Sequence, residues 1–269
     1  MPTALPTLRR NWLVTLRAYQ WTYFIGTLAT GILTVGLAYL AFHAVGGGRV
    51  GGGFGAAAGT ADYLGYVTIG AAALMFSTRM VLWVAKAQIT EQREGTLESQ
   101  MLAPARRLPY LIGVGAQALT TTLVEVAVML AFAIAIGVRL PAPDPVSLVA
   151  AVGAATVAVF GISVPLSAIM ITAGEAHITQ NTLFVGMALL CGFTFPPAFL
   201  PDVLRWLGEA LPVTSALRAM RAATLEQAPL SAVLPDLLLC VTLGSAYLLI
   251  GLRLLGPAER VAVRRGGAA

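Results

Sequence analysis

Long apolar runs alternate with short polar segments along this 269-residue chain. A helix needs about 20 apolar residues to cross the roughly 30 Å hydrocarbon core of a bilayer. Six runs reach that length, at residues 21–44, 63–85, 110–138, 146–173, 182–201 and 232–255. The pattern predicts one all-α, polytopic membrane domain with six transmembrane helices.

The segment before the first run has a different pattern. Its apolar residues recur at spacings of 3, 4, 4 and 3, which places them on one face of a helix: Leu5, Leu8, Trp12, Leu16 and Tyr19. This amphipathic pattern predicts an interfacial helix over residues 3–20, lying in the plane of the lipid headgroups. The alternative is that these residues only extend the first transmembrane helix into water.

Composition and charge agree with a membrane protein. Hydrophobic residues make up 58% of the chain and charged residues 11%, well below the roughly 25% charge of an average soluble domain. If both termini are cytoplasmic, 11 lysines and arginines lie inside and 5 outside, which is the bias of an inner (plasma) membrane protein. The net charge of +5 is therefore a signal of topology, and we do not expect nucleic-acid binding.

Two nucleotide-binding motifs can be excluded. The stretch GGGRVG at 46–51 matches G-x-G-x-x-G, but it follows a membrane run where a dinucleotide fold requires a strand. The only lysine, Lys86, follows Ala85, so the chain contains no Gly-Lys-Ser/Thr phosphate loop. We expect no ATP to bind this chain by that route.

No metal site is expected either. Cys191 and Cys240 fall within apolar runs, and His43 and His177 fall at opposite membrane faces in the predicted topology. Ligands so far apart cannot form a four-coordinate site. The cysteines are interpreted as small core residues.

Glu125 lies near the middle of the third run, where an ionisable residue faces protein or a water-filled cavity. Two roles stay open, a polar contact at a helix interface, with the carboxyl kept protonated, or a place on the transport path. At 1.5 Å per residue, Glu125 lies about 22 Å from the inner end of its run, and Arg79 about 24 Å from the outer end of its own. We therefore expect the two not to pair, and Arg79 to reach the inner headgroups.

The fifth run is broken near its end. The 14 residues from Thr182 to Phe195 span about 21 Å as a helix, and Pro196 and Pro197 are predicted to end it. The helix would then stop short of the outer surface. Phe195 and the two prolines are candidate residues of the transport path or outer gate.

Residues 199–225 contain two short amphipathic pieces separated at Pro212. The first piece carries Val203, Leu204, Leu207 and Leu211 on one face, which we expect to be buried, while Arg205 and Glu209 would face water. Helix that does not span the membrane is tolerated there when protein buries it. We expect a re-entrant helical pair in the outer leaflet, with Leu204 and Leu207 as further gate candidates; the alternative is an amphipathic external loop.

The stretch TEQREGTLESQMLAPARRLPYLIG at 90–113 is rich in charge. It predicts a cytoplasmic helix over 90–103, which ends before Pro104 because that proline disfavours the α region for Ala103. Leu97 and Met101 are one turn apart, as are Glu94 and Glu98, so an apolar ridge lies beside an acidic one. The helix is either a docking surface or a solvated connector.

Two stretches resemble one family. REGTLESQMLAPARRLPYLIG is similar to the first cytoplasmic loop of the ABC-2-type (type V) export permeases, through Glu94, Gly95, Thr96, Leu97, Glu98, Pro104, Arg106 and Gly113. GFTFPPAFLPDVLRWLGEALPVTSALRAMR is similar to the family's fifth span and re-entrant pair. The order of the elements extends the resemblance over nearly the whole chain.

The resemblance implies a transmembrane subunit that pairs with a second permease subunit, as a homodimer or a heterodimer. Two separate ATP-binding cassette subunits would hold ATP and Mg²⁺, so this chain needs no cofactor and is not itself an enzyme. The helix over 90–103 would be the coupling helix, and the residues implied to contact the ATPase are Glu94, Leu97, Glu98, Met101, Arg9, Arg10 and Trp12.

The resemblance is nearer the drug and antibiotic-resistance branch, which implies outward movement of a hydrophobic drug, an antibiotic or a lipid-like substrate. The alternative function is a secondary transporter or channel that uses Glu125 as an intramembrane proton or ion site.

Overall fold

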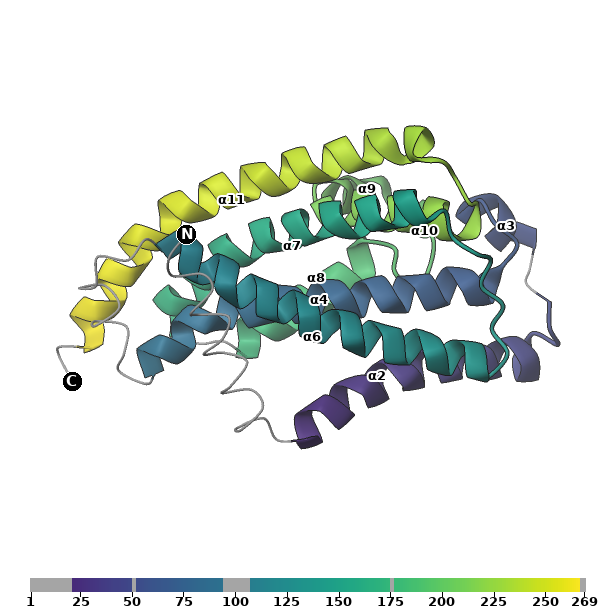
Figure 1. Cartoon of the computed structure of the whole chain (residues 1–269), viewed down its shortest axis with the longest axis horizontal. Coiled ribbons are helices and arrows are strands. Elements are labelled where there is room, and N and C mark those ends of the chain that lie inside the picture. Colours follow the sequence, from purple (N-terminus) through teal and green to yellow (C-terminus); the bar gives the residue numbers. More distant parts are fainter. Residues whose placement is uncertain (1–20, 50–51, 94–106, 175–176, 267–269) are drawn as a thin grey trace.

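The computed structural model describes residues 21–49, 52–93, 107–174 and 177–266, and every regular element in them is helical (Figure 1). In chain order the elements are α2 (Trp21–Leu40), the π-helical η1 (Ala41–Val45), α3 (Gly52–Ala58), α4 (Tyr63–Arg93), α6 (Arg107–Ala135), α7 (Pro145–Ala173), α8 (His177–Leu190), the 3₁₀-helical η2 (Pro197–Phe199), α9 (Asp202–Glu209), α10 (Pro212–Leu225) and α11 (Leu230–Gly266). The all-α prediction is confirmed for this part of the chain.

Four helices are long and apolar enough to cross a membrane. Their stretches are Tyr63–Glu91 in α4, Leu108–Ala135 in α6, Pro145–Ala173 in α7 and Leu230–Val261 in α11. Two apolar helices are shorter, Leu28–Ala44 across α2 and η1, and Asn181–Leu190 within α8. The described residues thus contain four helices of membrane length where the sequence pattern predicts six.

Helix α4 lies at the centre of the bundle. It packs against α2, α6, α7, α8 and α10, and 83% of its apolar stretch is buried, against 28% in α6 and 22% in α11. The outward leucines and valines of α6 and α11 need no protein cover in a bilayer, because lipid tails are as apolar as they are. The burial pattern therefore places α4 inside and α6 and α11 on the perimeter.

The inner end of α4 differs from the prediction. We expected a span ending at residue 85 and a separate helix beginning at residue 90, but α4 continues without a break to Arg93. Nothing in this stretch breaks a helix, since Ala87, Gln88 and Glu91 are all good helix formers. The first residues of the predicted coupling helix belong to α4, and residues 94–103 lie outside the described residues.

The turn from α6 to α7 is fixed by local hydrogen bonds. Gly137 has φ +99°, and the N–H groups of Gly137 and Val138 donate to the carbonyls of Ile134 and Ala133, which is a Schellman ending of α6. Helix α7 begins with Asp144, whose carboxylate accepts the Ser147 N–H at 2.8 Å. This turn lies at the same end of the molecule as α3 (Figure 1).

Helices α7 and α11 pack closely because glycines face the contact. A Cβ added to Gly244 would lie 2.6 Å from the Cα of Ala158, and one added to Gly251 would lie 2.5 Å from the Cδ of Pro165. A Cβ on Gly161 would overlap the carbonyl of Gly244. Small residues allow such close backbone approach between membrane helices, where van der Waals packing drives association.

Helix α8 ends earlier than predicted. It stops at Leu190, and Gly192 then adopts φ +74°, a left-handed conformation that favours glycine after a helix. A Cβ on Gly192 would lie 2.5 Å from the Cγ of Pro197. The prediction that Pro196 and Pro197 end the helix is wrong, because the chain has already turned at Gly192 and Pro197 opens η2.

Helices α9 and α10 lie in the half of the molecule that carries α3 (Figure 1). Helix α10 packs against α7, α11 and α4 and is buried along most of its length. Helix α9 contacts α8 and α10. Two short helices after α8 thus fill one end of the bundle, which we call the cap (α9 and α10).

Candidate functional site

The residues implied to contact an ATPase lie outside the described residues. They are Arg9, Arg10, Trp12, Glu94, Leu97, Glu98 and Met101. The structure describes the helix ends on either side of the second group, Arg93 of α4 and Arg107 of α6.

Arg79 and Glu125 form a buried ion pair between α4 and α6. The Arg79 Nε and Nη2 donate to Glu125 Oε2 and Oε1, with distances of 2.8 Å and 2.5 Å. The side chains are only 7% and 2% exposed. Two parallel hydrogen bonds between a guanidinium and a carboxylate fix orientation as well as distance.

The expectation that these residues lie too far apart is wrong, and so is the expectation that Arg79 reaches the headgroups. The prediction took residue 85 as the inner end of the second helix, whereas α4 continues to Arg93. Measured from the observed ends, Arg79 lies about 21 Å from Arg93 and Glu125 about 27 Å from Arg107 at helical rise. The two long side chains bridge the remaining difference.

A second polar contact joins the same helices at their inner ends. The Tyr110 hydroxyl of α6 donates to Glu91 Oε1 of α4 at 3.1 Å, and Glu91 is buried. Apolar residues of α4, α6, α7 and α11 pack around this end, namely Val84, Leu111, Val164 and Leu255. The α4–α6 hairpin is therefore held by polar contacts at two levels.

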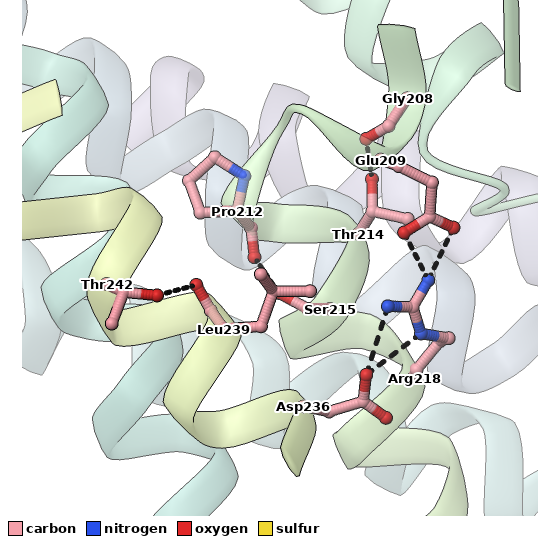
Figure 2. A network of polar contacts seen from close by, with 9 residues as sticks. All are labelled: Gly208, Glu209, Pro212, Thr214, Ser215, Arg218, Asp236, Leu239 and Thr242. Carbon is pink, nitrogen blue, oxygen red and sulfur yellow. Dashed lines mark hydrogen bonds and ion pairs between the residues drawn. The ribbon is translucent and has the colours of Figure 1, made fainter. Parts of the chain in front are cut away.

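A charged network at the other end joins α9, α10 and α11 (Figure 2). Arg218 Nη1 donates to Glu209 Oε1 and Oε2 at 2.5 and 2.7 Å, and its Nε donates to Asp236 Oδ1 at 3.0 Å. Burial by itself would lower the pKa of Arg218, but the hydrogen bonds and charges of Glu209 and Asp236 outweigh it and raise that pKa. The Thr214 hydroxyl donates to the Gly208 carbonyl at 2.5 Å and closes the α9–α10 turn.

Arg221 connects the cap to α4. Its guanidinium carbon lies 3.4 Å from the centre of the Tyr66 ring, a cation–π contact. Its Nη2 donates to the carbonyls of Phe193 at 2.9 Å and Tyr66 at 3.3 Å. Gly70 allows this approach, since a Cβ there would overlap the Phe193 carbonyl. One side chain of α10 thus holds both α4 and the segment after α8.

The predicted gate residues share no single buried face. Pro196 is buried, Phe195, Pro197 and Leu204 are half-buried, and Leu207 is 53% exposed. They lie on the segment between α8 and α9 and on α9 itself. The structure brings them to the cap without enclosing them in one cluster.

The face of α9 that was expected to be buried is covered only in part within this chain. Leu204 and Leu211 are half-buried, whereas Val203 and Leu207 are 72% and 53% exposed. Trp206 and Phe199 are also exposed, at 74% and 59%. The Glu209 side chain, expected to face water, is 41% exposed and also binds Arg218. Helix α9 rests on α8 through Gly208, where a Cβ would overlap the Leu190 carbonyl, so its bulky apolar side chains point away from the bundle.

Sequence reasoning missed the partners of the buried charges. In the sequence, Arg221 is one of the arginines assigned to the outer side and the last residue of the second family-like stretch, and nothing in the pattern around Tyr66 indicates that the two meet. The usable signal was an arginine and a glutamate in the interiors of consecutive apolar helices, which must be compensated within the protein. The apolar patterns of two antiparallel helices do not fix their register, so the sequence does not show which residues pair.

The chain matches the ABC-2 type transporter family over residues 7–225. The match covers α2 to α10 and includes the segment between α4 and α6, the Arg79–Glu125 pair and the cap. The chain is a member of the ABC-2 type transporter family. A search of curated proteins found no match.

Membership of the ABC-2 family makes the chain the membrane-embedded permease component of an ABC transport system, not its ATPase. ABC-2 permeases normally work with an ATP-binding cassette subunit. The apolar helices α4, α6, α7 and α11 agree with a membrane location for this ABC-2 permease.

Proposed function

We propose that this permease is the transmembrane subunit of an ATP-driven exporter that moves a hydrophobic drug, an antibiotic or a lipid-like substrate outward. The observation that carries the proposal is the ABC-2 family match over residues 7–225. The chain would lie in the inner membrane with both termini cytoplasmic, as the lysine and arginine bias indicates. It would have six spans, with α2–η1 and α8 as the two short ones and the cap as a re-entrant pair.

The ATPase contact would be residues 90–103 between α4 and α6, with the interfacial helix over 3–20 beside it. Because the chain has no phosphate loop, work must enter through a contact whose free energy differs between two states of the permease. Glu94, Leu97, Glu98 and Met101 are the proposed contact residues, with Arg9, Arg10 and Trp12 at the amino-terminal helix.

A second permease subunit would pack against α8 and α9. Helix α8 exposes Asn181 and Thr182 at the start of its apolar stretch Asn181–Leu190, and polar side chains in membranes favour positions between helices. Helix α9 is in contact with α8 and adds exposed apolar side chains, among them Val203 and Trp206. Trp206 is a large exposed apolar side chain on this helix, and tryptophan is a residue type that often contributes much of the binding energy at the centre of an interface.

The alternative of a secondary transporter is less well supported. A proton or ion site needs a carboxylate that is free to exchange, whereas both Glu125 oxygens accept from Arg79 in a buried pair. This geometry suits a structural link between α4 and α6 better than it suits a site for proton or ion exchange.

The test is ATP hydrolysis by purified protein in liposomes. The chain alone should hydrolyse no ATP, and activity should appear with its cognate ATPase subunit and rise with the transported compound. Hydrolysis by the chain alone, or substrate flux driven only by a proton gradient, would contradict the proposal.

A further inference from the structure

Helix α4 has polar attachments near both ends and in the middle. At its inner end Glu91 accepts from Tyr110 of α6, in its middle Arg79 binds Glu125, and near its other end Tyr66 lies under Arg221 of α10. Glu91 and Tyr66 are separated by about 38 Å at helical rise. A single unbroken helix thus reaches from the loop joining α4 and α6 to the cap.

The middle attachment fixes how α4 and α6 can move relative to each other. Sliding or rotating one helix would separate Arg79 from Glu125, and both are buried where water cannot replace the lost contact. Leaving one member of a buried pair uncompensated is strongly unfavourable. The two helices on either side of the loop therefore hold one register.

Stability alone is a poor explanation for this pair. Apolar side chains of similar volume often stabilise a buried site as well as an ion pair does, or better, because they need no desolvation. What apolar contacts do not supply is a unique register, since they allow small sliding movements. The bidentate geometry of Arg79 and Glu125 supplies it.

At the cap, the joint between α4 and α10 is also specific. Arg221 binds the Tyr66 ring, the Tyr66 carbonyl and the Phe193 carbonyl, so a shift of α4 displaces α10 and the segment after α8 together. Arg218, three residues earlier, binds Glu209 and Asp236 instead. Helix α10 therefore contacts α4 through Arg221 and binds α9 and α11 through Arg218.

We propose that Arg79 and Glu125 are positioning residues for coupling: they hold α4 and α6 in one register, so that a displacement applied at the inner ends of these helices reaches the cap through Tyr66 and Arg221. The proposal rests on the proposed ATP-driven function. It concerns how motion crosses the membrane domain.

The test uses the permease assembled with its cognate ATPase subunit in liposomes. An environment-sensitive fluorophore is attached at Arg205→Cys, a half-exposed position on α9, after the buried Cys191 and Cys240 are replaced by alanine. The readout is the emission change on trapping with Mg·ATP and vanadate. If the labelled permease that keeps Arg79 and Glu125 shows no emission change on trapping, the proposed function fails. That result is distinct from the outcomes below.

The decisive variant is Arg79→Met with Glu125→Leu, which removes the ion pair and keeps apolar bulk. We expect it to assemble and to bind the ATPase subunit, but to lose at least nine-tenths of the emission change. The matched control is Val124→Met, a change beside Glu125 at an outward position that is 54% exposed, which should respond fully. A full response from the double variant would overturn the proposal.

Arg79→Lys gives a second measurement should the double variant fail to assemble. Lysine keeps the positive charge but cannot make the parallel pair of hydrogen bonds. We expect assembly with an emission change reduced at least twofold. An unchanged response in Arg79→Lys would overturn the proposal as well.

Discussion

At the scale of single residues, Arg79 and Glu125 form a buried ion pair between two membrane helices. Arg79→Met would leave the Glu125 carboxyl without its partner in a site that is 2% exposed. We expect this single variant to lose about 3–5 kcal/mol of unfolding free energy. The measurement is denaturant titration of the purified protein in mild detergent, followed by tryptophan fluorescence.

The double variant Arg79→Met with Glu125→Leu is the control for this residue-scale prediction. It removes both charges, so its stability should return to within about 1 kcal/mol of the wild type or exceed it. Equal losses in the single and double variants would mean that packing volume matters there and the unpaired charge does not.

At the scale of elements, the contact between α7 and α11 depends on glycine. Gly161→Ala places a methyl group against the Gly244 backbone, so the helices must separate. We expect a loss of about 1–3 kcal/mol, the range for overpacking a tight site. Gly153→Ala is the matched control, since it makes the same change in the same helix with no atom within 4 Å of the new Cβ.

The control variant should be neutral or gain up to about 1 kcal/mol from helix propensity. Thermal unfolding monitored by size-exclusion chromatography ranks the two variants. A Gly161→Ala protein as stable as Gly153→Ala would show that α7 and α11 are not held at this distance.

At the scale of the whole molecule, the first prediction concerns the segment between α4 and α6. Leu97→Asp or Glu98→Lys should weaken binding of the ATPase subunit about thirtyfold, since a central interface residue contributes about 2 kcal/mol or more. Membrane insertion should be normal because both residues lie outside the apolar runs. Glu226→Lys, a charge reversal at an exposed residue after α10, is the control and should bind normally.

Co-purification of a tagged ATPase subunit with each permease variant provides the measurement. Normal binding by both Leu97→Asp and Glu98→Lys would make this segment a solvated connector. Loss of binding in Glu226→Lys as well would point to a general defect in folding.

The second whole-molecule prediction concerns the exposed face of α9. Trp206→Cys, with Cys191 and Cys240 replaced, should form a disulfide cross-link between two permease subunits in the membrane. We expect this because the side chain at 206 is exposed and its neighbours on α9 are exposed apolar residues. Leu254→Cys, at a position 47% exposed on α11, should stay monomeric under the same oxidant. Cross-links at 254 and none at 206 would place the second subunit on α11.

The sequence by itself determined that this is a helical membrane protein. Apolar runs of membrane length leave the backbone no partner in lipid except its own carbonyls, so helix follows from length and hydropathy alone. The locations of α4, α6, α7 and α11 were predictable on that basis, as was the pair of short helices after α8, because Pro212 and the amphipathic spacing act locally. The family relationship was likewise readable from ordered motifs.

Only the tertiary structure decided how the helices register against one another. A helix end can extend by two turns without any change in its apolar pattern, as α4 does by continuing to Arg93, and this shift brings Arg79 within reach of Glu125. The turn at Gly192, after α8 ends at Leu190, lies against Pro197. Arg221 binds Tyr66 and Phe193, which are 155 and 28 residues away in the chain. Such contacts join residues that share no local periodicity, so their pairing is set by packing in three dimensions.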